Sequence, residues 1–321
     1  MQSARARTVP LRFTLAFAGW CHKTAMSKPP VETNATVMSI ASETTAQTAP
    51  GRPPEIESPS NLYFIHPISR ALAGGLARTP VTPNQVSVSG LVAAGTAGLC
   101  YLELPWPWNA FVGFAFHLGW HVLDGADGDL ARRTGRASPI GELVDGVCDH
   151  AGQFLIYIPL VYLAMRHLGS WVWGVAWAAG AAHFLQANAY ETARKAYRRF
   201  VYGAAWMRQT GAGKRGVGAL LASIYLGFSD LLSPGEATVE QAMAAAPPEL
   251  GRRLYREAFQ PLVKASSVLS MNTRTFAVFV AVLIQRPLWF FLFELTVLNL
   301  ALVVLAVWRA RTSAALAAAL A

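Results

Sequence analysis

The sequence predicts an all-α, polytopic membrane protein with about six transmembrane helices, preceded by an amphipathic helix on the membrane surface. Three observations support this prediction. Of the 321 residues, 53% are hydrophobic, and only 14% are charged. The apolar stretches are also each close to the length that crosses a bilayer, at about 1.5 Å of helix per residue. They cover residues 86–103, 107–123, 144–165, 171–190, 268–285 and 288–308.

The fifth apolar stretch is the least regular. Asn272, Thr273 and Arg274 interrupt its start, and Arg286 with Pro287 closes it early. We therefore expect a short or re-entrant element there. Polar groups at the start of a span are costly and often functional. Asn272 and Arg274 could bind the acceptor, or Arg274 could extend to the lipid head groups, and the sequence leaves both readings open.

The remaining parts of the chain differ in composition. Residues 1–60 are rich in Ser, Thr, Ala and Pro and lack sustained periodicity, which predicts a disordered tail. Residues 61–78 place apolar side chains near one face, as expected for a helix on a membrane surface. We expect the membrane domain to cover residues 61–311, with a cytoplasmic segment at 191–267, and residues 312–321 to form a C-terminal tail.

The basic residues predict the orientation of the chain. The formal net charge is +9, and nearly all Lys and Arg residues after residue 60 fall on one side of the predicted spans. The positive-inside rule then places both termini and residues 124–149 in the cytoplasm, in a bacterial inner membrane. The run from Arg194 to Arg199 is read as an orientation anchor. Because no nucleic-acid motif is present, the basic residues indicate lipid head groups and phosphorylated substrates as partners.

Four aspartates are the main functional signal. Asp124 and Asp127 are three residues apart, and Asp145 and Asp149 are four apart, so each pair shares one helix face. Carboxylates that face one another at a membrane boundary repel strongly unless a cation compensates them. Mg²⁺ or Mn²⁺ prefers such oxygen ligands and leaves positions for phosphates. The cluster therefore predicts a divalent metal site for a diphosphate, whereas a solvated acidic loop would not flank apolar spans.

Small and basic residues accompany the aspartates. Gly128 and Gly141 lack side chains and would let a base or a diphosphate approach the helix backbone closely. Ala131 keeps the same surface shallow. Arg132 can neutralise phosphate charge.

These residues resemble the signature of the CDP-alcohol phosphotransferase family, DxxDGxxARx8GxxxDxxxD. The predicted span layout, the surface helix and the TPNQVS segment before the first span resemble the family as well. Residues 1–60 and most of 205–265 lie outside the resemblance. Every fixed position of the signature is present, namely Asp124, Asp127, Gly128, Ala131, Arg132, Gly141, Asp145 and Asp149.

The resemblance implies a role for each of these positions. Two Mg²⁺ or Mn²⁺ ions would lie among the four aspartates, with Asp124 and Asp145 bridging them. Asp149 would also take the proton from the acceptor hydroxyl, which attacks the β-phosphorus of the CDP-alcohol and releases CMP. A homodimer is implied as well. The CDP portion would be held by Asn84, Gln85, Ser87, Gly128, Ala131, Arg132, Ser138 and Gly141.

The implied reaction belongs to phospholipid biosynthesis. The simplest donor is CDP-diacylglycerol, with an inositol, glycerol or amino-alcohol derivative as acceptor. The inverse arrangement, a soluble CDP-linked head group and a lipid alcohol, shares the motif, so which substrate is the lipid stays open. Two other classes remain as alternatives. An intramembrane prenyltransferase also places aspartates around Mg²⁺, but the Gly and Ala-Arg positions argue against it. A cation-binding transporter would require broken helices or inverted repeats.

Several polar residues near the motif have simpler readings. His121 lies one turn before Asp124 on the same face, and we expect it to pack or to make a hydrogen bond behind the metal ligands. His117 and His183 are expected to be buried and hydrogen-bonded. Asp129 matches no fixed position and is expected to be solvated.

Overall fold

The computed structural model describes residues 53–204 and 235–321. In these ranges the chain is helical, with short connections and no strand, which confirms the predicted all-α class. The helices, among them short 3₁₀ or π segments labelled η, are η1 (Pro54–Ile56), η2 (Asn61–Ile65), α2 (His66–Leu76), α3 (Pro83–Glu103), α4 (Trp108–Thr134), α5 (Pro139–Leu168), α6 (Val172–Tyr202), α9 (Glu236–Ala245), α10 (Pro248–Ala265), η3 (Ser266–Leu269), α11 (Met271–Leu283), α12 (Leu288–Phe293), η4 (Glu294–Leu298) and α13 (Asn299–Leu320).

Local sequence signals explain where the helices near the aspartates begin and end. At the start of α3, Thr82 and Gln85 form a capping box, in which each side chain bonds the other residue's backbone N–H. Helix α4 ends at Gly135, whose φ of 64° is left-handed and suits glycine. Ser138 then caps α5, because its Oγ accepts the Gly141 N–H at 3.0 Å. This tight turn brings the end of α4 beside the start of α5.

Two glycines set how closely the first long helices pack. A Cβ at Gly98 of α3 would lie 2.1 Å from the backbone oxygen of Leu155 in α5. A Cβ at Gly152 of α5 would lie 2.6 Å from Cζ2 of Trp120 in α4. Neither distance is possible for a real side chain, so glycine permits this approach of the helices.

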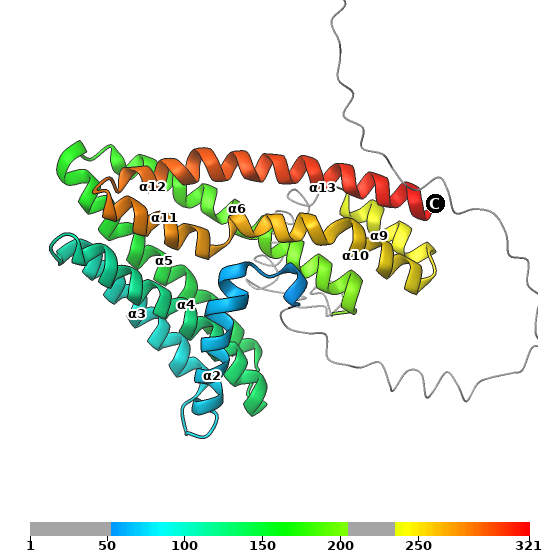
Figure 1. The fold of residues 1–321 in the computed structure, drawn as a ribbon, viewed down its shortest axis with the longest axis horizontal. Helices are drawn as coiled ribbons and strands as arrows, with labels where there is room; N and C mark the ends of the chain where they lie inside the picture. Colours follow the sequence, from blue (N-terminus) through cyan, green and yellow to red (C-terminus); the bar gives the residue numbers. More distant parts are fainter. Residues whose placement is uncertain (1–52, 205–234) are drawn as a thin grey trace, which may run out of the picture. The chain divides into compact units, whose positions relative to one another are not determined.

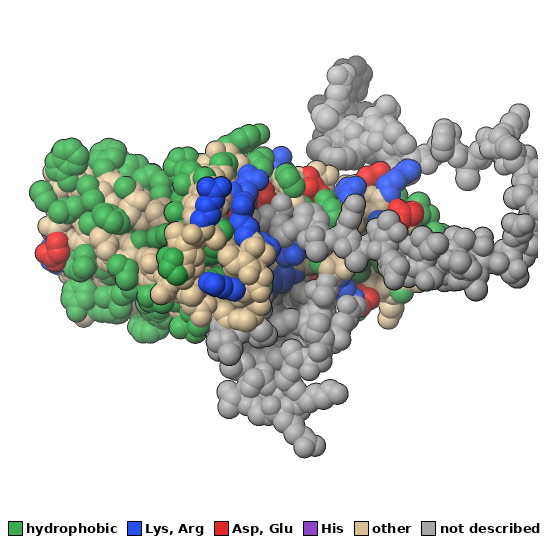
Figure 2. Space-filling view, turned by 90° about the horizontal axis from the view of Figure 1, so that it is seen from below, with side chains coloured by type: hydrophobic (Ala, Val, Ile, Leu, Met, Phe, Trp, Pro, Cys, Tyr) green, Lys and Arg blue, Asp and Glu red, His purple; other side chains and the backbone are tan. Residues whose placement is uncertain are grey.

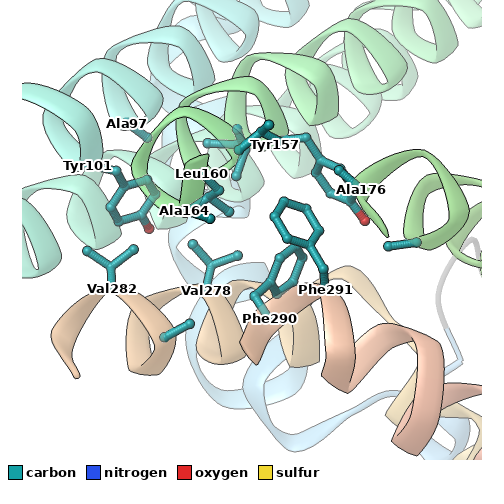
Figure 3. Packing of buried hydrophobic residues seen from close by; sticks show 14 of the residues in the cluster. Ala97, Tyr101, Tyr157, Leu160, Ala164, Ala176, Val278, Val282, Phe290 and Phe291 are labelled. Atoms are coloured by element: carbon teal, nitrogen blue, oxygen red, sulfur yellow. The ribbon is translucent and has the colours of Figure 1, made fainter. Parts of the chain in front are cut away.

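The largest buried cluster of the described residues joins six helices, α3, α4, α5, α6, α11 and α12. Figure 3 shows side chains of α3, α5, α6, α11 and α12 meeting between the helices. Aromatic rings fill the space where α5 faces α12: the Tyr157 ring lies 5.4 Å from the ring centroids of both Phe290 and Phe291, close to edge-on. This cluster supports the helices that carry the aspartates.

Four helical segments of the described ranges are long and apolar enough to cross a membrane, in agreement with a polytopic membrane protein. The expected second and fourth spans, α4 and α6, are not among them, because both carry many polar residues. Helix α11 covers only 13 residues, as the irregular fifth stretch predicted. The four segments are Pro83–Glu103, Val144–Leu168, Pro248–Leu283 and Leu288–Leu320.

The surface is consistent with this assignment. Figure 2 shows apolar side chains covering one end of the described part, with Lys and Arg side chains gathered farther along. Exposed tryptophans lie at the connections between helices at the apolar end: Trp106 and Trp108 between α3 and α4, Trp171 before α6, and Trp289 at the start of α12. Tryptophan is enriched at membrane interfaces, so these positions fit interfacial anchors.

A second cluster lies away from the apolar end and corrects two expected boundaries. In Figure 1, α13 runs from α12 towards α9 and α10, which pack against its C-terminal half. Ser313 and Leu316 are buried there, so residues 312–321 continue a packed helix and form no tail. Ile56 is completely buried in the same cluster, so the packed chain begins before residue 60. The expected tail over residues 1–52 lies outside the described residues.

Candidate active site and metal centre

Three aspartates meet where α4 ends and α5 begins. Carboxylate oxygens of Asp124, Asp145 and Asp149 all lie within 4.8 Å of one another, and each side chain is partly buried. Helical spacing gives this arrangement: Asp145 and Asp149 share one face of α5, and the turn at Gly135 sets Asp124 opposite them. The structure therefore brings together three of the four aspartates that the motif singled out.

The fourth aspartate contacts a different helix. Asp127 is 4% exposed, and its Oδ2 accepts a hydrogen bond of 2.5 Å from the Ser87 hydroxyl of α3. Its carboxylate is outside the group of three, although it lies one turn from Asp124. Ser87, expected to contact a nucleotide, thus holds Asp127 instead.

The three gathered carboxylates fit a divalent cation. Like charges a few ångströms apart in a partly buried site repel, and each tends to be protonated unless positive charge is supplied. Carboxylate oxygens are hard ligands of the kind that Mg²⁺ and Mn²⁺ prefer. The donor set is thus suited to such an ion, which would offset the repulsion.

Three of the positions expected to hold a nucleotide, Asn84, Ser138 and Gly141, lie close together. A Cβ at Gly141 would lie 3.2 Å from Ser138 Oγ and 3.5 Å from Asn84 Oδ1, so the starts of α3 and α5 are close together. The side chain of Gln85 is engaged in the cap of α3, where its Oε1 accepts the Thr82 N–H at 2.9 Å.

Arg132 makes a contact that the sequence did not predict. Its guanidinium donates a hydrogen bond to Asp129, whose side chain is only 14% exposed. The expectation that Asp129 is solvated is therefore wrong, because it is the partner of Arg132 three residues later on the same helix face. A Cβ at Gly128 would lie 3.4 Å from Arg132 NH1, so glycine leaves room for this side chain.

A cavity of about 1100 Å³ opens beside the aspartates. Asp124 and Asp149 line it, and its walls between α5 and α6 are mainly apolar. None of the expected nucleotide positions lines this cavity. The apolar lining includes Phe154, Ile158, Val161, Trp173, Ala176 and Trp177.

Basic and polar residues line another part of this cavity. Arg194 and Lys195 of α6 contribute to the lining, together with Asn61 and Asn272. Sequence reasoning read the basic run as an orientation anchor and missed this position. An antiparallel pairing of α5 and α6 would have predicted this position, because it sets the residues near 191 opposite Asp149.

The histidines are held by neighbouring side chains. His121 Nε2 lies 2.6 Å from Thr275 Oγ1, and the same hydroxyl lies 3.2 Å from His117 Nε2. His117 Nδ1 is 3.2 Å from the Tyr101 hydroxyl. The expected packing role of His121 agrees with this geometry, because the ring is anchored on α11.

Arg274 follows neither of the two readings that its sequence position allowed. It is 2% exposed and does not line the cavity. Its Nε donates to Glu294 at 2.9 Å, and its NH2 donates to Gln186 Oε1 at 2.6 Å. Tyr157 and His183 also hydrogen-bond to the completely buried Glu294 carboxylate. Arg274 therefore links α11 to η4 through an internal ion pair and to α6 through a hydrogen bond.

Comparison with known proteins extends the motif to a longer stretch of chain. A model of the CDP-alcohol phosphatidyltransferase family matches residues 80–243, about half of the 321 residues. A phosphatidylinositol phosphate synthase of Mycolicibacterium smegmatis is 29% identical over 116 residues, which are 35% of this chain and 51% of that protein. The chain thus spans about half the length of this curated relative.

The matched residues contain the whole aspartate site and helices α3 to α6. The resemblance read from residues 124–149 is therefore confirmed at the level of the family. On the combined grounds of the motif, the gathered carboxylates and the family model, this chain belongs to the CDP-alcohol phosphatidyltransferase family.

Proposed function

We propose that this protein is an integral membrane transferase of phospholipid biosynthesis, which moves a phosphatidyl group from CDP-diacylglycerol to a polar alcohol and releases CMP. One observation carries the proposal: three carboxylates with oxygens within 4.8 Å of one another stand beside a large, mostly apolar cavity. The cluster suits a diphosphate with its metal ions, and the cavity suits lipid chains.

Asp124, Asp127, Asp145 and Asp149 are proposed to hold two Mg²⁺ or Mn²⁺ ions. When bound, these ions supply positive charge that compensates the carboxylates and the donor diphosphate. Asp127 would take part through the edge of its carboxylate that does not face Ser87. The hydrogen bond from Ser87 of α3 would then orient this carboxylate.

Asp149 is the proposed general base. It lines the cavity, and its carboxylate can accept the proton of an acceptor hydroxyl that enters there. The acceptor oxygen forms a bond to the β-phosphorus of the donor, and the bond from that phosphorus to the oxygen bridging to CMP breaks. CMP leaves with the electron pair of that bond, so charge and atoms balance.

The nucleotide is proposed to lie on the opposite side of the carboxylates from the cavity. Asn84, Ser138 and Gly141 come together there, and Gly128, Ala131 and Arg132 follow along α4. We assign Gln85 a part in shaping this site through the cap of α3. Ser87 would act through Asp127.

The lipid part of the donor is proposed to occupy the apolar cavity between α5 and α6, open to the bilayer. The basic residues of the chain support an active site at the cytoplasmic face, in a bacterial inner membrane. We also propose a homodimer. Family membership favours this reaction over the prenyltransferase and transporter readings.

The test uses purified protein in lipid nanodiscs with Mg²⁺ or Mn²⁺. Radiolabelled CDP-diacylglycerol is supplied with a panel of water-soluble alcohols, and CMP release is measured. We expect CMP to form only when both substrates are present. A parallel reaction supplies CDP-choline and diacylglycerol. CMP from this second pair alone would overturn the proposed arrangement in favour of the inverse one, and CMP from neither would reject the activity.

A further inference from the structure

Two side-chain amides meet in the polar wall of the cavity. Asn61 of η2 and Asn272 of α11 both line this cavity, which Asp149 lines as well. Asn272 Nδ2 donates to Asn61 Oδ1 at 2.5 Å and to Ser60 Oγ at 2.8 Å. Both N–H groups of the Asn272 amide are therefore used in contacts between α11 and the segment before α2.

A buried carboxylate fixes the orientation of both amides. Asn61 Nδ2 donates at 3.1 Å to Oε2 of Glu57, whose side chain is 1% exposed. The other oxygen of Glu57 accepts a hydrogen bond of 2.9 Å from Arg194, a residue 137 positions later. An ionised carboxylate only accepts hydrogen bonds, so Asn61 turns its NH2 group to Glu57 and its oxygen to Asn272. Asn272 must then present its own NH2 group to that oxygen.

The hydrogen-bonding positions left over are one donor and one acceptor. Asn61 Nδ2 makes a single hydrogen bond among the described residues, which leaves its second N–H. Asn272 Oδ1 accepts none from these residues, and it is not among the fully buried atoms that lack a partner, so a ligand or water can reach it. A hydroxyl group donates one hydrogen bond and accepts another, so it complements this pair.

Positive charge lies in the same wall. Arg194 and Lys195 line the cavity, and Arg198 follows one turn later on α6. These three cations outnumber the two acids beside them, Glu57 and Glu191. A phosphate on the acceptor is therefore compatible with this wall. The amide pair carries no net charge, and it can pair with a hydroxyl whether or not the acceptor also bears a phosphate.

We propose that Asn61 and Asn272 bind a hydroxyl of the acceptor other than the one that reacts, and thereby make the enzyme select polyols over alcohols that lack this second hydroxyl. The inference rests on the proposed function, since it concerns the acceptor of that reaction. A site built to pair with a hydroxyl discriminates against an analogue without it, because the polar groups of the site are then left unpaired. Both residues lie outside the part of the chain that matches the family model, 80–243.

The first test compares acceptors that differ by one hydroxyl. Glycerol is paired with trimethylene glycol, and myo-inositol with its monodeoxy analogues; glycerol 3-phosphate and myo-inositol 1-phosphate are paired with their own deoxy analogues. CMP release from CDP-diacylglycerol is measured for wild type in nanodiscs. For the best acceptor, we expect loss of one hydroxyl that does not react to lower kcat/KM by about tenfold or more, equivalent to about 1.4 kcal/mol. Equal kcat/KM within every pair would overturn the proposal.

Asn272→Ala and Asn61→Ala assign this discrimination to the amide pair. In both variants we expect the KM of the best acceptor to rise about tenfold, with kcat and the KM of the donor changed by less than about twofold. The deoxy analogue should then be used about as well as the full polyol. The same discrimination in wild type and both variants would contradict the proposal.

Thr273→Ala and Ser60→Ala are the matched controls. Asn272 also borders a smaller cavity of about 270 Å³, which Thr273 and Ser60 line and Asn61 does not. Ser60→Ala removes one contact between α11 and the segment before α2, but it leaves the amide pair in place. We expect both controls to keep the wild-type KM and the preference for the polyol. An equal rise of the acceptor KM in Ser60→Ala would show that loosening of this segment causes the effect.

A binding measurement separates this inference from the proposed reaction. Saturation-transfer NMR records contact of the same four polyols with wild type, Asn272→Ala and Thr273→Ala in nanodiscs with Mg²⁺, without donor. We expect at least one polyol to receive saturation from wild type and Thr273→Ala, and much less from Asn272→Ala. No transfer to any polyol, or equal transfer from all three proteins, would overturn the inference. Failure of every acceptor to release CMP would reject the reaction, and this measurement would still decide the role of the amide pair.

Discussion

Two groups of charged side chains lie among the helices of this protein, and they differ in their balance of charge. Asp124, Asp145 and Asp149 bring like charges within 4.8 Å. Arg274 and Glu294 bring opposite charges together at 2.9 Å, where both are almost completely buried. The first group is stabilised by adding a cation, whereas the second is complete without a ligand. Charge inside a membrane protein therefore indicates a ligand site most clearly when its sign is not balanced.

Metal removal should produce the largest difference between the two groups. We expect a chelator to reduce CMP release by at least about a thousandfold, because bound metal contributes several kcal/mol to such a transfer. Mg²⁺ or Mn²⁺ should restore the activity. Helix content, measured by circular dichroism, should not change, since the Arg274–Glu294 pair needs no ion. Full activity in the presence of the chelator would show that the aspartate cluster needs no metal ion for the reaction.

Asp149→Asn should have the next largest effect. Loss of a general base costs about 10²–10⁴-fold in rate, so CMP release should fall by this factor. The variant keeps the shape of the side chain, and Mn²⁺ titration shows whether the site still holds metal. Undiminished turnover with metal bound would remove Asp149 from the role of base.

Arg274→Leu tests the balanced pair. Breaking a buried pair leaves Glu294 uncompensated, and we expect a loss of about 3–5 kcal/mol in the free energy of unfolding. Unfolding in mixed detergent micelles measures this change. The double variant Arg274→Leu, Glu294→Leu leaves no unpaired charge and should recover part of the loss. Equal stability of Arg274→Leu and wild type would show that the pair does not stabilise the fold.

Ser87→Ala gives the smallest expected effect. It removes the hydrogen bond to Asp127, and hydrogen bonds to charged groups contribute about 1.5–3 kcal/mol. We expect a fall of this order in the free energy of unfolding, with a modest loss of Mn²⁺ affinity. Ser89→Ala is the control, because Ser89 is an exposed residue of α3 whose hydroxyl donates to the Gln85 carbonyl and, within the described ranges, to no carboxylate. An equal loss of unfolding free energy in Ser89→Ala would show that the loss in Ser87→Ala comes from replacing serine in helix α3 and not from the hydrogen bond to Asp127.

The motif made the aspartate cluster predictable, since its spacing puts the side chains on shared helix faces and the turn at Gly135 is short. Hydropathy likewise predicted the helical class and the short fifth segment. Contacts between distant positions were not predictable. Arg194 meets Glu57 across 137 residues, and Arg274 meets Glu294 across 20, and no periodicity encodes either pairing.

The ends of the chain were misread for a related reason. Residues 312–321 are mostly alanine and carry little amphipathic pattern, so they gave no sign of the partner helices α9 and α10. A helix that packs through a few small side chains, such as Ser313, looks like a tail when its neighbours are unknown. The same holds for Ile56, a single apolar residue in a polar stretch.

The glycine at position 152 has a consequence for how such sequences can diverge. It lies three residues after Asp149, and the indole that it contacts, Trp120, lies four residues before Asp124. The width of the gap between the two acidic helices is thus set one turn away from the acids themselves. We expect natural variants that retain this tryptophan to keep glycine at 152, because a side chain there would push the two acidic helices apart without altering any group that binds the ion.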